Sequence, residues 1–370
     1  MPALIASVGL ALGMAACSSG GPSGDGSSTG AASAGVDKAA VTAAIKSYVG
    51  QPSAFPITDP LKQVRKGATI AWVDNSTPIS GLLWSLLQPA GKAMGVNLVR
   101  YSVGSAADKV SAGFDSVLAA RPAAVIVGGI DPQLWHNQLT RLQAARIPVV
   151  TTGILGTQRY GIKNPQAAEA ASQLEGKLMA DYVAAKIGGN SKVAFYDVPE
   201  LSFTSEVTRG FQGELARVCS NCSVRVVHIP IATIGNTAPN HIVSDLQTHP
   251  DTTIAVFASD ETETGLPAAL QTAGITVKTM GASPGPTNLE YVKEGKETAA
   301  LAVDLPVLAW TVVDAAAREM VGQDLTGLEA KGIADYQFLT KTDINFDPSK
   351  GWTGYPDFAQ KFAKLWGTGA

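Results

Sequence analysis

Residues 123–132 read Ala-Ala-Val-Ile-Val-Gly-Gly-Ile-Asp-Pro, and this stretch decides the fold class. Its apolar run has no polar alternation, which is typical of a strand buried on both faces of a parallel sheet. The run breaks at a glycine pair and then supplies one carboxylate, Asp131, just past the strand. Ligands of open α/β sheets bind at that carboxyl edge. Several other runs end in the same way, so we expect polar side chains to converge on one cleft.

Strand and helix patterns alternate around this stretch. The first half has apolar runs at 69–73, 98–101, 125–127 and 147–151, separated by helical stripes at 80–95, 107–119 and 133–145. The second half has strands expected at 192–196, 224–229, 253–257, 276–280, 298–303 and 333–339, with helices at 165–186, 203–218, 237–246 (Thr237 as N-cap), 262–273, 287–294 and 306–321. A weak helix at 37–48 and a terminal helix at 355–366 flank these. The absence of hairpin signals predicts an α/β fold with two doubly wound parallel sheets.

Length and composition fit this architecture. The 370 residues leave room for two sizeable cores, and 45% of them are hydrophobic against 16% charged. The formal net charge is −3 and no basic run occurs, which argues against a nucleic-acid partner.

The N-terminal residues have the character of a targeting segment. Residues 3–16 are almost wholly apolar, too short to span a membrane, and end at Met14-Ala15-Ala16-Cys17. That ending resembles the bacterial lipobox, whose cysteine becomes the lipidated N-terminus, so 1–17 is expected to be a lipoprotein signal peptide. Residues 18–35 are rich in Ser, Gly and Ala and are expected to be a flexible tether. No Lys or Arg precedes the apolar run, so we expect the true start to lie upstream; the alternative is an ordinary buried helix.

The other cysteines, Cys219 and Cys222, lie in a polar turn between a helical stretch and a strand. In an exported protein this spacing favours a local disulfide. A redox pair would precede a helix rather than follow one. The histidines are scattered and offer no zinc-ligand spacing, so no metal is expected.

Six stretches occur in an order that resembles one known family. They are Ala68-Thr-Ile-Ala-Trp-Val73, Ala124-Val-Ile-Val-Gly-Gly-Ile-Asp131, Ala144-Ala-Arg-Ile-Pro-Val-Val150, Arg209-Gly-Phe211, Ile254-Ala-Val-Phe-Ala-Ser-Asp260-Glu261 and Ala299-Ala-Leu-Ala-Val-Asp304. The order and spacing resemble the type I solute-binding proteins of ABC importers, in the ribose- and galactose-binding group.

This resemblance implies two Rossmann-like lobes joined by three crossing strands, with hinge closure around a ligand. Lobe 1 would hold 67–153 and 305–332, and lobe 2 would hold 154–304 and 333–345. Residues 18–66 would form the tether and an N-terminal extension, and 346–370 a C-terminal tail. The crossings would fall near 153–163, 304–306 and 333–336. The family's members are monomers without cofactors that hand a solute to a membrane permease.

The resemblance also implies site residues. Asp74, Asn75 and Ser76 match the family's first polar ligand loop, Asp131 matches a carboxylate that takes sugar hydroxyls, and Asp260 and Asp304 match two further polar positions. Ionised carboxylates accept several strong O–H bonds, which suits a hydroxyl-rich ligand. The remaining expected contacts are the rings of Trp135 and Phe203 and the hydroxyls of Thr204, Ser205 and Ser283.

The chain also departs from the family pattern. Gly153-Ile154 replaces an Asp-Arg pair, Ser205 replaces a second arginine, and Ser283 replaces an aspartate. The aromatic wall of the first lobe has become Ile79-Ser-Gly-Leu82. The missing arginines argue against an anion and against a standard hexose or pentose.

For several of these residues a structural role is the alternative. Asp131 and Asp260 could simply cap the helices that follow them. Trp135 could pack in the core, as large aromatic side chains usually do.

Three functions are open at this point. The favoured one is a lipid-anchored, extracytoplasmic receptor for a small neutral sugar or polyol, with an aromatic, nucleoside-like or amine solute as the rival ligand. An enzyme lacks support, because the chain has no G-x-G-x-x-G after its first strand, no G-x-S-x-G, no P-loop and no His-rich metal motif. A ligand sensor for a membrane kinase is the third.

Overall fold

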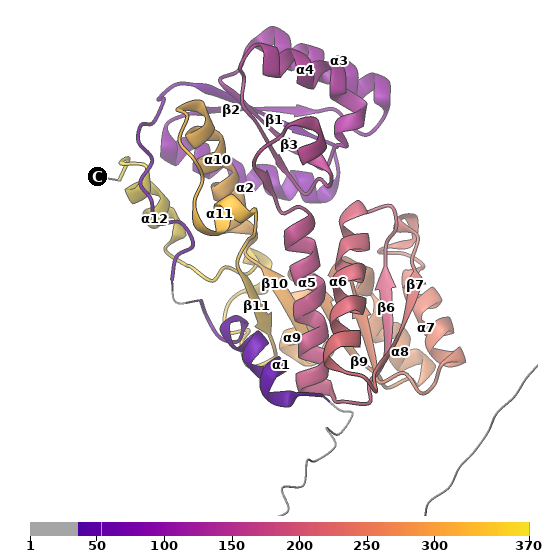
Figure 1. Cartoon of the computed structure of the whole chain (residues 1–370). Helices are drawn as coiled ribbons and strands as arrows, with labels where there is room; N and C mark the ends of the chain where they lie inside the picture. The colour runs from indigo at the N-terminus through magenta and orange to yellow at the C-terminus, as the bar shows by residue number, and fades with distance from the viewer. Residues whose placement is uncertain (1–35, 53, 370) are drawn as a thin grey trace, which may run out of the picture. The chain divides into compact units, whose positions relative to one another are not determined.

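The computed structural model describes residues 36–52 and 54–369, and their strands form two sheets (Figure 1). The α/β fold class predicted from the sequence is confirmed. Cys17 and the tether lie outside the described residues. Within the described part of the chain, no helix is both long enough and apolar enough to cross a bilayer.

The first sheet is wholly parallel, with strand order β2-β1-β3-β4-β5. Its strands are β1 (Thr69–Asp74), β2 (Asn97–Ser102), β3 (Ala124–Gly128), β4 (Val149–Thr152) and β5 (Pro165–Gln166). One face packs against α2 (Pro78–Met94), and the other against α3 (Ala107–Ala120) and α4 (His136–Ala144). The 3₁₀ turns η2 (Pro132–Trp135) and η3 (Thr157–Tyr160) follow β3 and β4. All five residues of β3 are buried, as expected of a central parallel strand.

The second sheet has the order β11-β10-β9-β8-β6-β7, parallel except for β11. Its strands are β6 (Lys192–Asp197), β7 (Ser223–His228), β8 (Ile254–Phe257), β9 (Lys278–Ala282), β10 (Ala299–Val303) and β11 (Tyr336–Leu339). One face carries α5 (Glu169–Tyr182) and α6 (Ser202–Val218). The other carries α7 (Ala238–Thr248), α8 (Leu266–Ala273) and α9 (Pro286–Glu294), over two separate apolar clusters.

Smaller elements complete this region. The helix α1 (Lys38–Ile45) and the turn η1 (Lys46–Tyr48) precede the first sheet in sequence, and α1 packs beside α5. The π-helical segment η4 (Val183–Ile187) continues α5, and the 3₁₀ turns η5 (Ile231–Thr233) and η6 (Asp260–Glu263) lie between later elements of the second sheet. Cys219 and Cys222 are joined by a disulfide, with Cα atoms 5.3 Å apart.

Helices α5 and α6 approach each other closely enough for their backbones to touch. A Cβ on Gly176 of α5 would lie 2.0 Å from the carbonyl oxygen of Val207. A Cβ on Gly210 of α6 would lie 2.3 Å from the carbonyl oxygen of Gln173. Only glycine fits at these two positions.

The chain returns to the first sheet after β10. Helix α10 (Leu305–Met320) follows that strand directly and packs on α2, β3 and β4. Helix α11 (Gly327–Lys331) precedes β11, and η7 (Pro348–Lys350) and α12 (Phe358–Leu365) form the tail. The tail contacts the chain ahead of β1: the hydroxyl of Tyr355 donates to the carbonyl of Ala54 at 2.5 Å, and the Leu61 amide donates to the Leu365 carbonyl at 2.9 Å.

The structure differs from the expected elements at several points. The segment after β4 loops back as β5, with Thr152 opposite Gln166, so the chain leaves the first sheet later than the expected crossing at 153–163. The helix expected at 262–273 is two elements, because Gly265 (φ +86°) interrupts it between η6 and α8. Thr237 makes no side-chain hydrogen bond as N-cap of α7. The strand expected at 333–339 is present as β11, but its antiparallel direction and the short α11 were not anticipated.

Candidate functional site

The glycine pair at the end of β3, Gly128 and Gly129, makes room for two neighbours on β1 and its loop. A Cβ on Gly128 would lie 2.4 Å from the Trp72 ring, and one on Gly129 would lie 2.8 Å from Nδ2 of Asn75. Gly129 has φ +66°, a backbone conformation that glycine adopts without strain. Asn75 donates to the Gly129 carbonyl at 3.0 Å, so the loops after β1 and β3 are tied together at the carboxyl edge of the sheet.

The oxygen of the Asn75 amide organises its own loop. It accepts hydrogen bonds from the Thr77 amide and hydroxyl and from the Ser80 hydroxyl, the last at 2.7 Å. The Asn75 side chain therefore stabilises the conformation of the loop that contains Ser76.

Asp74 is fully buried and engaged within the protein. Its carboxylate accepts from Nε of Arg100 at 2.6 Å, from the Ser76 amide and from the Ser102 hydroxyl. Burial alone would raise the pKa of Asp74, but these hydrogen bonds outweigh it and hold the pKa below its ordinary value. The structure thus corrects the expectation that Asp74 contacts a ligand, and Arg100 on β2 is neutralised by it.

Two of the expected contacts have a left-handed backbone. Ser76, after β1, has φ +64°, and Ser283, after β9, has φ +61°. Non-glycine residues in this conformation are uncommon, and they gather at functional sites. Ser76 is exposed and Ser283 half-buried, so both hydroxyl-bearing turns are accessible at the carboxyl edges of their sheets.

Asp131 and Trp135, both expected to contact a ligand, differ in exposure. Asp131 is exposed, and one of its oxygens accepts from the Gln133 amide at 2.8 Å, as a cap of η2. Trp135 is wholly buried: its ring stacks on Phe114 with centroids 4.4 Å apart, and its N–H donates to the carbonyl of Ile130. The structure places Trp135 in the core, which corrects its expected place in a ligand wall.

The start of α6 carries three expected contacts. Phe203 is half-buried and packs against the core. Thr204 is fully buried, and its hydroxyl donates to the carbonyls of Val198 and Leu201. Ser205 is exposed, with its hydroxyl donating to the Ser202 carbonyl at 2.7 Å. Phe203 and Ser205 are accessible, whereas Thr204 holds the turn that precedes them.

Asp260 and Asp304 are both fully buried, against expectation. Asp304 caps α10 through the Val307 amide at 3.0 Å, and it accepts from the Thr353 hydroxyl and the Gly354 amide at 2.9 and 2.8 Å. Burial raises its pKa to about 6. Asp260 turns its carboxyl inward, beneath η6, beside two other carboxyl groups. Neither side chain is placed to contact a ligand at the sheet edge.

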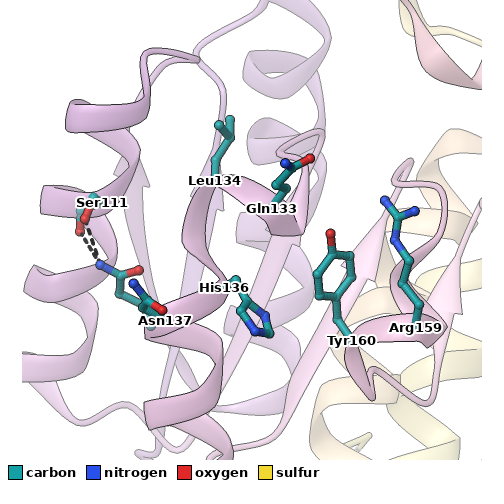
Figure 2. A pocket seen from close by; sticks show the side chains of 8 residues that line it. Ser111, Gln133, Leu134, His136, Asn137, Arg159 and Tyr160 are labelled. Atoms are coloured by element: carbon teal, nitrogen blue, oxygen red, sulfur yellow. Dashed lines mark hydrogen bonds between the residues drawn. The ribbon is translucent and has the colours of Figure 1, made fainter.

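A hollow of about 720 Å³ opens beside the first sheet, lined by residues of α3, η2, α4 and η3 (Figure 2). Figure 2 shows His136 beside Tyr160, and their ring centroids lie 5.4 Å apart. Gln138 reaches across to the Ser111 hydroxyl at 2.8 Å. None of the ligand contacts expected from the sequence lines this hollow.

Sequence reasoning missed two side chains at the strand ends. Arg100 gave a signal, because a cation near the end of one strand faces an aspartate at the end of its neighbour. Asp197, the last residue of β6, is buried and accepts from the Thr208 hydroxyl at 3.3 Å.

Comparison with known families bears directly on this arrangement. A model of the periplasmic binding protein domain matches residues 78–324, more than half of the chain. The chain belongs to the periplasmic binding protein family, type I. Proteins of this family work outside the cytoplasm, and the homologues are solute-binding components of transport rather than enzymes. This periplasmic binding protein is accordingly not an enzyme.

Relatives and solved structures agree with this assignment. The ribose import binding protein of Salmonella typhimurium is 28% identical over 220 residues, which cover 58% of this chain and 71% of that protein. A solute-binding protein from Actinobacillus succinogenes with bound D-allose has a TM-score of 0.65 at 18% identity, covering 77% of this chain and all of that one. One from Agrobacterium vitis with bound allitol has a TM-score of 0.62 at 18% identity, covering 76% and 97%. This periplasmic binding protein thus has the fold of the sugar- and polyol-binding proteins of ABC transporters.

Proposed function

We propose that this protein is the solute-binding subunit of an ABC importer and captures a small neutral sugar or polyol. The ligand would lie between the carboxyl edges of the two sheets, enclosed by a hinge movement of the two lobes. Its lobes would be those expected from the sequence, except that the first crossing follows Gln166. Cys17 would carry the lipid anchor, and the protein would act as a monomer.

The observation that carries the proposal is the chemistry of those edges. Exposed or half-buried hydroxyls stand at Ser76, Ser205 and Ser283, and exposed carboxylates stand at Asp131, Glu200 and Glu261, after β3, β6 and β8. Arg100, at the same edge, is neutralised by Asp74. Hydroxyls and carboxylates suit a neutral polyhydroxylated ligand, because both accept hydrogen bonds from its O–H groups.

Apolar side chains complete the surface that we propose for the ligand. Ile79 and Leu82, at the start of α2, are 43% and 42% exposed, close in sequence to Ser76. Phe203 stands at the start of α6. Ligand sites combine an apolar wall with a few placed polar groups. Aliphatic side chains would here take the place of aromatic rings against the C–H face of a sugar or polyol.

The test is a thermal-shift screen against D-ribose, D-allose, allitol, myo-inositol, nucleosides, aromatic acids and amines. A ligand at a thousand times its Kd adds about 4 kcal/mol, or about 10 °C. Asp131→Asn removes a charge-assisted hydrogen bond, so we expect affinity to fall by about 10- to 100-fold. Asp108→Asn, an exposed aspartate at the start of α3, is the matched control and should leave affinity unchanged.

The outcomes separate the alternatives. A shift with nucleosides, aromatics or amines alone would keep the solute receptor and reject the sugar or polyol. A sugar bound equally well by Asp131→Asn and the parent would reject the proposed site. The absence of any shift across the panel in folded protein would favour a ligand sensor of different specificity.

A further inference from the structure

A group of three carboxyl side chains lies buried beneath the 3₁₀ turn η6. Because such a turn has three residues per turn, Asp260 and Glu263 project from the same face. Glu297, two residues before β10, has a carboxyl oxygen close to theirs. All three are at most 1% exposed, and one oxygen from each lies within 4.8 Å of the others.

The oxygens of this acidic cluster lack hydrogen-bond partners. Among the described residues, neither oxygen of Asp260 or Glu263 is hydrogen-bonded, nor is Oε2 of Glu297. The other Glu297 oxygen accepts from the Gly281 amide at 3.2 Å. Thr279, which is 1% exposed, lies against Glu263. Its hydroxyl is too far from, or poorly aligned with, any described acceptor to form a regular hydrogen bond. Buried polar groups nearly always have a hydrogen-bond donor, acceptor or ion as partner. The unpaired oxygens of this cluster therefore indicate a partner that binds carboxylate oxygens.

The surrounding backbone is shaped to hold the cluster. Gly281 on β9 has no side chain where a Cβ would lie 2.1 Å from Oδ1 of Asp260. Asn288 on α9 is buried and donates to the Asp260 carbonyl at 2.8 Å, which fixes η6 over the sheet. Strand β9, helix α9 and η6 therefore form the walls of one site. It lies between the two apolar clusters of this face of the second sheet.

Charge decides what this site can hold. Within residues 36–52 and 54–369 no Lys, Arg or His forms an ion pair with any of the three carboxylates, and burial raises the pKa of each. Three unpaired buried charges cannot persist, so the cluster takes up either protons or a cation. Protons would be shared as carboxyl–carboxylate hydrogen bonds, and Asp260 and Glu297 face each other closely enough for one. Shared protons would still leave some carboxylate oxygens without a partner, whereas a cation could coordinate an oxygen from each of the three side chains.

We propose that Asp260, Glu263 and Glu297 form a calcium site, with the hydroxyl of Thr279 beside it. Ca²⁺–oxygen bonds of about 2.4 Å allow the oxygens around one ion to lie up to about 4.8 Å apart, so three oxygens that all lie within 4.8 Å of one another can share an ion. Carboxylates are the ligands of hard divalent cations. Ca²⁺ is favoured over Mg²⁺, because Mg²⁺ keeps several waters and this site is enclosed by protein. The ion would fix η6, which directly follows the carboxyl end of β8.

The test uses the full chain, stripped with EDTA and dialysed into chelator-free buffer. Isothermal titration with CaCl₂ should give one ion per chain, and a hundredfold excess over Kd should raise Tm by about 5 °C or more. MgCl₂ and MnCl₂ are titrated in parallel. Binding of Mg²⁺ in strong preference to Ca²⁺ would overturn the assignment of the ion.

Glu263→Gln locates the ion. The amide removes a buried charge without changing shape, so this variant should fold at least as readily as the metal-free parent. We expect it to weaken Ca²⁺ binding by at least about a hundredfold, since even outer-shell changes cost tenfold to a hundredfold. Glu297→Gln should do the same, and Glu290→Gln, an exposed acid on α9, should bind as the parent does. The proposal is overturned if the parent binds no divalent cation, or if both amide variants bind Ca²⁺ normally.

Discussion

Replacing Arg318 by leucine should be among the most destabilising single changes in this protein. The Arg318 side chain on α10 is fully buried, with Nε 2.6 Å from Oδ2 of Asp314 and 3.3 Å from Oε2 of Glu329. Its Nη2 donates to the carbonyl of Asp59 at 2.6 Å. Trp366 completes the group by donating to the other Asp314 oxygen, also at 2.6 Å. The Arg318–Asp314 pair thereby joins α10 to α11, to the segment ahead of β1 and to the tail.

The charge state of the group sets the size of the effect. Burial, and next the negative charge of Asp314, raise the pKa of Glu329 to about 10, so Glu329 is protonated at neutral pH. The buried charges are then one guanidinium and one carboxylate. Arg318→Leu leaves Asp314 buried without its cation, and breaking a buried pair in this way costs about 3–5 kcal/mol. For a chain of this size that is a fall in Tm of about 10 °C.

Urea unfolding followed by circular dichroism measures the difference. Arg141→Leu is the matched control, because its pair with Asp115 is exposed and should contribute below about 1 kcal/mol. Glu329→Gln should also cost little, because it replaces a neutral side chain. Equal small losses in the Arg318 and Arg141 variants would refute the buried pair. A loss in Glu329→Gln as large as that in Arg318→Leu would refute the protonated state of Glu329.

Three further changes test other parts of the structure. Gly176→Ala should lower the free energy of unfolding by several kcal/mol, because its Cβ would meet the Val207 carbonyl at 2.0 Å; thermal unfolding checks this, and an unchanged Tm would show that α5 and α6 can separate freely. Burial raises the pKa of Glu175 to about 8, so its favourable protonated state is fully present below its unfolded pKa near 4.5 and is lost as pH rises through 8. Glu175→Gln should therefore add about 3 kcal/mol at pH 7 and converge with the parent near pH 4.5, and parallel pH profiles would contradict this. Gly129→Ala should displace the Asn75 amide and weaken ligand binding while the protein stays folded, as a binding titration against the parent would show.

Most of the fold could be predicted from the sequence, because its signals are local. The apolar run of β3, the helical stripes and the glycine pair each need only neighbouring residues to be interpreted. Strand β5 could not be predicted, since it is two residues long and forms only because it meets β4. The strand β11 was predicted, but its antiparallel direction depends on its partner β10, far away in sequence.

The candidate site was harder to predict than the fold. A strand-end carboxylate signals a site, but the sequence does not say which way the side chain turns. Asp131 turns outward, whereas Asp74, Asp260 and Asp304 turn inward to Arg100, to other carboxyl groups or to backbone amides. The partners that decide this lie 26 to 50 residues away in the hydrogen bonds of Asp74 and Asp304. The acidic cluster escaped notice for the same reason.

The contacts of the tail bear on the order in which the protein can assemble. The carboxylate of Asp304 is hydrogen-bonded by Gly354, and that of Asp314 by Trp366. The segment ahead of β1 is hydrogen-bonded to Tyr355 and Leu365. During synthesis the strands of both sheets, the last of which ends at Leu339, therefore leave the ribosome before the residues that complete the contacts of α10 and of the segment ahead of β1. Such distant contacts close late and slowly. The contacts made by residues 353–366 are then expected to be among the last to form, and until they close the buried carboxylates of α10 and its cap lack these partners.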